Sequence, residues 1–174
     1  LARDNKETHR NFCFKVGDVR GNDCLSFFNG MYLARDKIAG MVRKWHTLVE
    51  ADVDVTTKDG SVWRFFASAV TRRRAGQTGK TTYLKSSEMR AVRKIMVDVI
   101  RSEVDGQDTD RIIKKLSTES IGKLIESRCA EISNMTAVVR KVKPIKNTRI
   151  IDLSAVSAGD RAEERNTVEI LAEN

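Results

Sequence analysis

The residues most suggestive of chemistry form a basic, glycine-containing loop at positions 76–81, with the sequence Gly-Gln-Thr-Gly-Lys-Thr. A loop that wraps nucleotide phosphates needs a glycine five residues before its Gly-Lys pair, and it leads directly into a helix whose N-terminus faces the phosphates. Arg74 stands where that glycine is required, and residues 81–85 separate the loop from the next helical pattern. The sequence therefore disfavours a nucleotide-dependent enzyme, which we keep as the first alternative.

Other catalytic and metal-binding patterns are incomplete. The three cysteines form no Cys-x-x-Cys pair, and the two histidines complete no zinc-ligand spacing. Asp52 and Asp54 resemble a carboxylate pair, but they alternate with apolar residues as the solvent face of a strand does. We therefore predict no enzyme activity, no metal and no cofactor. The sparse, odd set of cysteines favours reduced thiols in an intracellular protein.

The basic residues gather instead in three clusters. Arg72, Arg73 and Arg74 follow a predicted strand without an intervening acid, and the planar arginine side chain suits bidentate contact with phosphate oxygens. A second cluster lies along a predicted helix. A third surrounds Pro144, and we expect it to wrap around an edge, because residues 140, 141 and 143 cannot share one face of a regular strand. The predicted RNA contacts are Arg72, Arg73, Arg74, Lys80, Lys85, Arg90, Arg93, Lys94, Arg140, Lys141 and Lys143.

Few aromatic residues accompany these clusters. Tyr83 is the one candidate for stacking on an unpaired base, so we expect contacts with the backbone and shape of folded RNA rather than with base edges. An isolated lysine has a plainer interpretation, since Lys94 can pair with Asp98 at a helical spacing of four. The arginine triplet is thus the strongest candidate for phosphate contact.

Composition favours a polyanionic partner as well. The 174 residues include 32 Lys and Arg against 24 Asp and Glu, a net charge of +8 with a pI near 9.6, and such a surplus attracts phosphates. Residues 154–174 hold two basic and five acidic residues, which leaves a net charge of +11 for residues 1–153. We predict a basic domain over 1–153 and a net-acidic tail over 154–174. No apolar run approaches the length of a membrane span.

Periodicity in the first third of the chain predicts two strands and a helix. Phe12, Phe14 and Val16 alternate as in a strand over 11–16, residues 17–23 are typical of a loop, and an apolar stretch over 24–28 ends at an Asn-Gly turn signal. From position 35 to 49 the apolar residues fall within one arc of a helix. Trp45 is predicted to be its core anchor, and His46, outside that arc, a surface residue.

The rest of the chain predicts a hairpin followed by helices and a last strand. Strands over 51–56 and 61–70 flank a Lys-Asp-Gly turn, and a basic loop covers 71–83. A long amphipathic helix follows over 87–104, then two short helices around 112–116 and 121–132, and a strand over 136–143. The order favours an α+β domain with a mostly antiparallel sheet, whose closure toward a barrel stays open.

Five segments of the chain resemble the S-three-A family of eukaryotic and archaeal small-subunit ribosomal proteins in order and spacing. They are GNDCLSFFNGM (21–31), MVRKWHTLVEADVDVTTKDG (41–60), TRRRAGQTGKTTY (71–83), SIGKLIE (120–126) and VVRKVK (138–143). The resemblance covers roughly residues 10–146, and the block over 45–60 is its most specific part. Family members usually carry a long basic extension and a further strand region ahead of the position of Leu1.

The resemblance implies a structural role without a catalytic motif. It implies binding to ribosomal RNA on the platform of the small subunit, near the messenger exit, with neighbouring ribosomal proteins as partners and with no membrane or small-molecule substrate. The implied location is the cytoplasmic ribosome, with nuclear or nucleolar passage during assembly if the source is eukaryotic. A protein-interaction module, in which the acidic tail and helices dock partners and RNA contact is secondary, is the second alternative.

Overall fold

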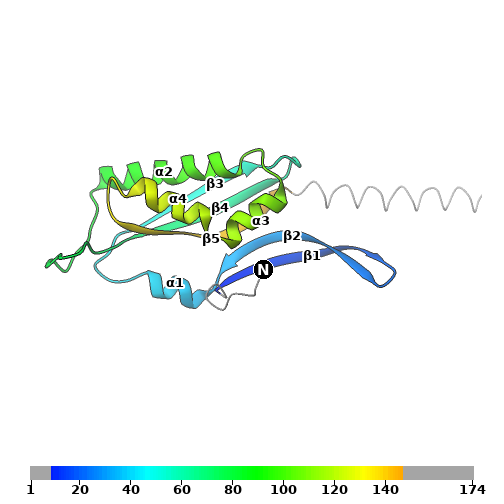
Figure 1. Ribbon diagram of the computed structural model, residues 1–174, viewed down its shortest axis with the longest axis horizontal. Coiled ribbons are helices and arrows are strands. Elements are labelled where there is room, and N and C mark those ends of the chain that lie inside the picture. Colours follow the sequence, from blue (N-terminus) through cyan, green and yellow to red (C-terminus); the bar gives the residue numbers. More distant parts are fainter. Residues whose placement is uncertain (1–8, 147–174) are drawn as a thin grey trace, which may run out of the picture.

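The computed structural model describes residues 9–146 as an α+β domain, which confirms the predicted fold class (Figure 1). The predicted acidic tail lies outside the described residues, so its boundary stays a prediction. In chain order the elements are β1 (Arg10–Arg20), β2 (Asp23–Leu33), α1 (Arg35–Met41), β3 (Leu48–Thr56), β4 (Val62–Thr71), α2 (Ser86–Val104), α3 (Thr109–Ser117), α4 (Ser120–Cys129) and β5 (Met135–Lys146). Within this range no helix is both long and apolar enough to cross a membrane.

The strands form one antiparallel sheet in the order β1-β2-β5-β4-β3. Because the order begins at β1 and ends at β3 without a pairing between them, the sheet is open over the described residues rather than closed into a barrel. β2 meets β5 through only two residue pairs, Met31 with Val142 and Tyr32 with Lys141. Among residues 9–146, the first half of β5 therefore has no strand neighbour on its β2 side.

Helix α4 covers part of that free edge of β5. Glu126 Oε1 accepts a hydrogen bond from the backbone N–H of Ala137 at 2.9 Å. A side chain at Gly122 would place its Cβ 2.6 Å from the Ala137 carbonyl oxygen, so glycine is required for this close approach. The helix thus satisfies a strand edge that would otherwise be exposed to pairing with another chain.

The hydrophobic core lies between one face of the sheet and the helices α2, α3 and α4. Alternate residues of β3 point into it, as the sequence pattern predicts, and Phe65 of β4 is fully buried at its centre. Helix α2 packs on β3, and α4 packs on β5. The core residues of α2 are Val92, Met96, Val99, Ile100 and Val104, while Met89 and Ile95 are half-buried beside them.

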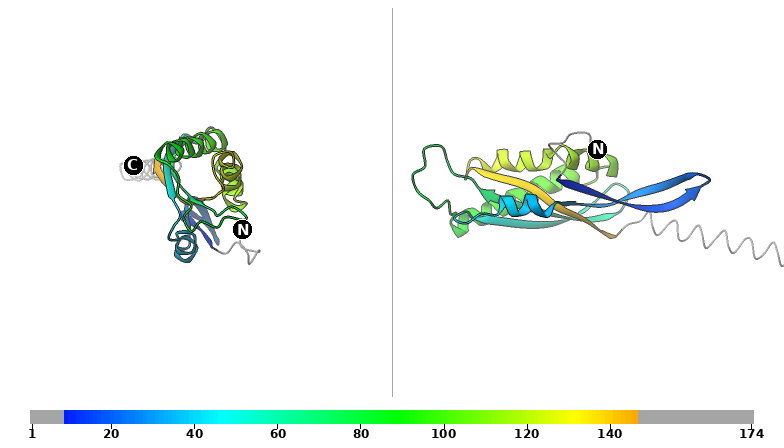
Figure 2. Two further views of the ribbon diagram at one scale, coloured as in Figure 1. Left: turned by 90° about the vertical axis from the view of Figure 1, so that its left-hand side faces the viewer. Right: turned by 90° about the horizontal axis from the view of Figure 1, so that it is seen from below.

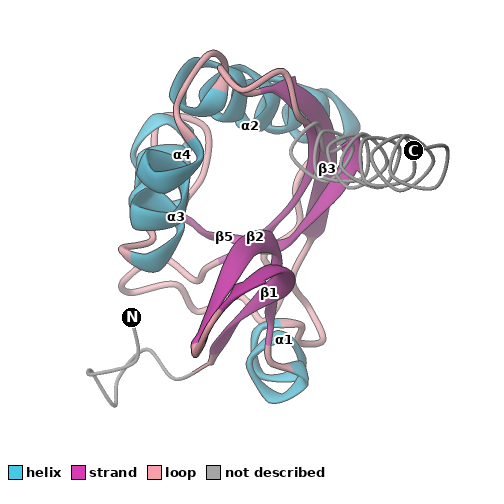
Figure 3. Cartoon of the chain, turned by 90° about the vertical axis from the view of Figure 1, so that its right-hand side faces the viewer, coloured by secondary structure: helices cyan, strands magenta, loops and turns pink. Residues whose placement is uncertain are grey.

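Helix α1 lies on the opposite side of the sheet (Figure 3). Ile38 and Met41 of α1, and Val42 directly after it, border a small crevice together with Val70 of β4 and Val138 of β5. We call this side of the sheet the outer face. Because α1 has only seven residues, it covers one end of that face.

The predicted helix over 35–49 is wrong in its second half. α1 ends at Met41, Trp45 has a left-handed backbone with φ = +70°, and its side chain is 42% exposed, so it is not a core anchor. Val49 instead belongs to β3, whose nine residues pair in unbroken register with β4. Sheet pairing and the burial of alternate β-branched residues outweigh the helical period here, and Gly40 weakens the helix near its end.

The first hairpin is also longer than predicted. β1 and β2 continue through most of the expected loop over 17–23 and turn only at Gly21 and Asn22, and the expected Asn-Gly turn lies inside β2. Gly30 has φ = +129° opposite an irregular register in β1, and a Cβ there would lie 2.5 Å from the Val142 carbonyl oxygen. Gly30 therefore indicates a bulge and a close backbone approach rather than a turn. Figures 1 and 2 show the turn end of the hairpin projecting past the helices.

Candidate nucleic-acid interface

The arginine triplet begins where β4 ends, at Thr71. The backbone N–H of Arg72 donates to the carbonyl of Asn134 at 2.8 Å, which extends the β4–β5 ladder by one residue. The buried Thr71 hydroxyl accepts a hydrogen bond from the Thr47 N–H at 3.0 Å and donates to the Thr82 carbonyl at 2.7 Å. Both ends of the basic loop are therefore fixed to the sheet at one buried residue.

The Gln77 side chain holds the interior of the loop. It accepts a hydrogen bond from the Arg74 N–H at 3.2 Å and donates to the carbonyls of Thr81 at 2.9 Å and Gly79 at 3.1 Å. Lys80 Nζ lies 4.2 Å from the centre of the Trp45 ring, a cation–π contact. The loop is ordered by its own contacts, and α2 begins only at Ser86, so the loop does not lead directly into a helix N-terminus.

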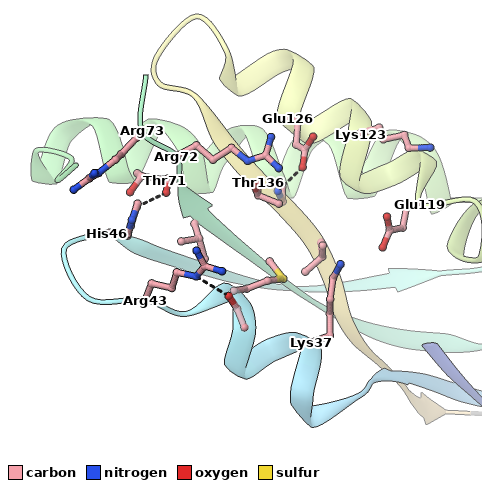
Figure 4. Close-up of a pocket in the computed structure, with 15 residues that line it drawn as sticks. Lys37, Arg43, His46, Thr71, Arg72, Arg73, Glu119, Lys123, Glu126 and Thr136 are labelled. Atoms are coloured by element: carbon pink, nitrogen blue, oxygen red, sulfur yellow. Dashed lines mark hydrogen bonds between the residues drawn. The ribbon is translucent and has the colours of Figure 1, made fainter. Parts of the chain in front are cut away.

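A hollow of about 580 Å³ lies between α1, α4, the free edge of β5 and the end of β4, and we call it the basic hollow. Figure 4 shows its side chains converging from elements that are far apart in sequence. Arg72 and Arg73 of the predicted site line it. The structure adds four nitrogen-bearing side chains that the sequence analysis did not select, namely Lys37, Arg43, His46 and Lys123.

Two acids, Glu119 and Glu126, also line the basic hollow, but both have partners. Glu126 accepts the Ala137 N–H described above, and Glu119 pairs with Arg10 and with His9. Burial by itself raises the pKa of Glu119, but the hydrogen bonds and charges of Arg10 and His9 outweigh it and hold that pKa below its usual value. Glu119 is therefore ionised at neutral pH and committed to Arg10, which ties the start of β1 to the start of α4.

The cations of the hollow are less neutralised than its acids. Over residues 9–146 no ion pair joins Lys37, Arg72 or Lys123 to a carboxylate. Among the described residues, Arg43 donates to the carbonyl of Gly40 at 3.1 Å and Arg73 to the carbonyl of Lys80 at 3.1 Å, and neither contacts a carboxylate. A concave site with this surplus of positive charge attracts anions.

His46 is half-buried rather than a surface residue. Its Nδ1 lies 2.6 Å from the Thr71 carbonyl oxygen, and because a carbonyl only accepts, Nδ1 carries the hydrogen. The ring is thereby oriented at the wall of the basic hollow, with Nε2 as its remaining polar atom.

The other predicted contacts around the loop and α2 lie outside this hollow. Arg74 borders a second hollow of about 510 Å³ with Tyr83 and Glu88. Lys85 is exposed at the N-cap of α2, and its N–H donates to Glu88 at 2.9 Å. Arg90 and Lys94 are exposed on α2, whereas Arg93 donates to the Glu50 carbonyl of edge strand β3 at 3.0 Å. These cations therefore lie apart from the basic hollow.

The cluster on β5 does not wrap around an edge, which corrects the sequence-based expectation. Phe66 is opposite Lys141 and Ala67 is opposite Val139, so Arg140 is the extra residue of a β-bulge. The Arg140 and Lys143 cations lie 5.9 and 5.8 Å from the centre of the Phe66 ring. Arg140, Lys141 and Lys143 therefore share the outer face of the sheet, and Arg140 also pairs with Glu50 at 3.0 Å.

Tyr83 is likewise not the only aromatic residue near the basic clusters. Tyr32 of β2 and Phe66 of β4 flank Lys141 on the outer face, one on each neighbouring strand. The sequence alone does not associate them with Lys141, because each belongs to a different strand and periodicity does not reveal strand order. Among residues 9–146 no group of three or more His, Cys, Asp or Glu side chains is placed to hold a metal ion.

Comparison with known proteins identifies the family to which this chain belongs. Residues 1–148 match the model of the Ribosomal S3Ae family. The chain is 46% identical over 161 residues to the small ribosomal subunit protein eS1 of Encephalitozoon cuniculi, which covers 92% of this chain and 67% of that protein. The proteins of the same name from Enterocytozoon bieneusi and Brugia malayi are 49% and 45% identical, over 82% and 76% of this chain and 56% and 52% of their own lengths. The chain thus spans between about half and two thirds of the length of these relatives, and it belongs to the Ribosomal S3Ae family.

Proposed function

We propose that this chain is a structural, RNA-binding constituent of the small ribosomal subunit and that it catalyses no reaction. The observation that carries the proposal is the basic hollow, where cations from α1, β4 and α4 converge with little acidic compensation. The relatives named small ribosomal subunit protein eS1 support the ribosomal part. By family resemblance, the proposal extends to the platform near the messenger exit, to neighbouring ribosomal proteins as partners and to the cytoplasmic ribosome, with nucleolar passage in a eukaryote.

The proposed mechanism is recognition of the RNA backbone. Arginine forks at Arg72 and Arg73 receive phosphate oxygens at one end of the hollow, while Lys37 and Lys123 add charge from its two walls. The loop is already ordered by Gln77 and Thr71, so little conformational entropy is lost when RNA binds. Such contacts fix position and orientation without reading base sequence.

Salt dependence tests this mechanism. Replacing Arg72, Arg73 and Arg74 together by alanine should flatten the plot of log affinity against log salt for a folded RNA hairpin, because each lost phosphate contact removes about 0.7 to 0.9 from the slope. The matched control replaces three exposed cations outside both hollows, Arg111, Lys114 and Arg128. An equal change of slope in both variants, or none in the first, would show that the loop does not contact RNA.

The structure sharpens this test with residues from the walls of the hollow. Lys37→Ala and Lys123→Ala should each lower the slope by about one phosphate contact. If only the arginine triplet matters, the RNA binds the loop without entering the basic hollow.

The nucleotide-dependent alternative is tested at Lys80. In a working phosphate loop this lysine reaches the terminal phosphates, whereas here its ammonium group lies over Trp45. We expect no saturable binding or hydrolysis of ATP or GTP by the wild type. Tight nucleotide binding that is lost in Lys80→Ala would overturn the assignment as a structural protein.

One observation favours a protein partner in addition to RNA. Phe14, Val16 and Val19 on the projecting β1–β2 hairpin are 49%, 57% and 61% exposed, and such side chains are typical of contact surfaces. Sedimentation with small ribosomal subunits at graded salt separates the contributions, because apolar association persists at salt concentrations that release phosphate contacts.

A further inference from the structure

The open part of the outer sheet face carries an aromatic and basic surface that lies apart from the basic hollow. We propose that this surface binds an unpaired, single-stranded segment of RNA, with bases stacked on Tyr32 and Phe66 and with phosphates held by Lys141 and Lys143. This inference rests on the proposed function as an RNA-binding protein, and it adds a second site of a different kind, which recognises bases as well as backbone.

Strand register brings the four residues together. Tyr32 of β2 is directly opposite Lys141 of β5, and Lys141 is directly opposite Phe66 of β4, so the three side chains form a row across three strands on one face. Lys143 lies in the next row of the same face, opposite Arg64. The two rings are therefore separated by two strand spacings, about 10 Å, with a cation between them.

This part of the outer face is accessible. Tyr32 is 46% exposed, and Lys141 and Lys143 are exposed. The crevice beneath α1 is lined by Leu48, Val70 and Val138 and extends to Glu50, Ser68 and Arg140, so it borders Phe66 but includes none of the four residues of the proposed site. Among the described residues, none of the helices that build the core reaches this side, since they all lie across the sheet from α1 (Figure 3).

The charges on the outer face indicate the path of the RNA. Arg64 is neutralised by a bidentate pair with Asp54, with both hydrogen bonds at 2.6 Å, and Arg140 is paired with Glu50. Within residues 9–146, no carboxylate pairs with Lys141 or Lys143. The acids all lie on β3, so the phosphates should pass over β5 and β2 and leave β3 uncovered.

A substitution at Asp52 can test this path of the RNA. It is exposed and directly opposite Phe66, and among residues 9–146 it forms no ion pair, although the charge of Arg64 acts on it. A carboxylate beside a stacked nucleotide repels the nearest phosphate. Removing its charge should therefore strengthen RNA binding, which is the opposite sign to the ring and lysine substitutions.

Single-stranded RNA fits this surface better than the alternatives do. Aromatic side chains on a sheet stack readily on unpaired bases, whose faces are hidden in a duplex. An acidic peptide would use the lysines but would gain little from two separate flat rings. The cations flanking Phe66 lie near the outer limit of cation–π contact, so they border the ring rather than cover it.

Fluorescence anisotropy with labelled oligouridine and the full chain tests the proposal. Tyr32→Leu and Phe66→Leu should each weaken binding about tenfold, the effect of losing one stacked base. Phe14→Leu, a ring 49% exposed on the projecting hairpin, is the matched control and should change the affinity less than twofold. Asp52→Asn should bind more tightly than wild type. Phe66→Tyr keeps the ring and should retain binding even if Phe66→Leu unfolds.

The outcomes separate this inference from the proposed function. If the Tyr32 and Phe66 variants bind oligouridine as wild type does while the arginine triplet still controls the RNA hairpin, the stacking site is wrong and the basic hollow stands. If the RNA hairpin binds neither the wild type nor any variant, the proposed function itself is wrong. Binding of polyglutamate that is lost in Lys141→Ala but unchanged in Tyr32→Leu would assign the face to an acidic protein and overturn the inference.

Discussion

The two faces of the sheet use the same strands for different purposes. On the covered face, alternate residues of β3 and β4 pack against α2 and α4, and Phe65 is fully buried. On the outer face the intervening residues include Asp54 and Glu50, which form ion pairs with Arg64 and Arg140, and Phe66 lies beside them. Because neighbours along a strand point to opposite faces, substitutions one position apart should separate stability from binding.

The largest expected difference is between Phe65 and Phe66. Phe65→Ala should lower the free energy of unfolding by about 3 to 5 kcal/mol, as truncation of a fully buried aromatic residue does. Phe66→Ala should lower it by about 1 kcal/mol, since the half-buried ring loses cation–π and cross-strand contacts only. Urea denaturation of both variants measures this, and equal losses would mean that the outer face is packed like the core.

A smaller loss is expected at the ion pair that ties β1 to α4. Glu119→Gln removes the carboxylate that pairs with the buried Arg10 guanidinium and should lower the free energy of unfolding by about 2 kcal/mol, less than for a fully buried pair because Glu119 is partly exposed.

The same pair should make stability pH-dependent. Because folding lowers the pKa of Glu119 from its ordinary value of 4.5, its contribution is present above that value and is lost as the pH falls through the folded-state pKa. Denaturation curves at neutral and acidic pH should therefore show a smaller acid-induced loss for Glu119→Gln than for wild type. A parallel loss in both proteins would assign the acid sensitivity to other carboxylates.

The sequence predicted the parts of this fold whose signals are local. The strand over 51–56 alternates cleanly, the strand over 61–70 is rich in Phe, Val and Trp after a Lys-Asp-Gly turn, and α2 has an uninterrupted helical period, so these elements are found where expected. The segment over 35–49 misled the prediction because α1 and the start of β3 together mimic one helical arc across a break. Periodicity cannot show such a break when apolar residues lie on both sides of it.

The candidate sites were only partly predictable for a related reason. Arg72 and Arg73 are recognisable in the sequence as part of a run of like charges. Lys37 and Lys123, by contrast, are 86 residues apart in sequence and reach the same hollow from two different helices. The bulge at Arg140 could not be predicted from the sequence either, because it depends on how β5 pairs with β4. Convergence of this kind is a property of strand order and helix placement, which no single segment encodes.

The smallest stability effect is expected at Trp45, where sequence periodicity alone predicts a loss typical of a core residue. The side chain is 42% exposed, and its described polar contact is the cation–π interaction with Lys80, which at an exposed site is worth about 0.5 to 1 kcal/mol. Trp45→Ala should therefore lower the free energy of unfolding by less than about 1 kcal/mol.

A left-handed backbone with φ = +70° strains alanine as well as tryptophan, whereas glycine accepts it freely. Trp45→Gly should thus be at least as stable as Trp45→Ala, although glycine gains entropy in the unfolded chain. Thermal denaturation of the two variants tests this prediction. A loss of several kcal/mol in both would mean that Trp45 is a core residue and that α1 has its longer, predicted form.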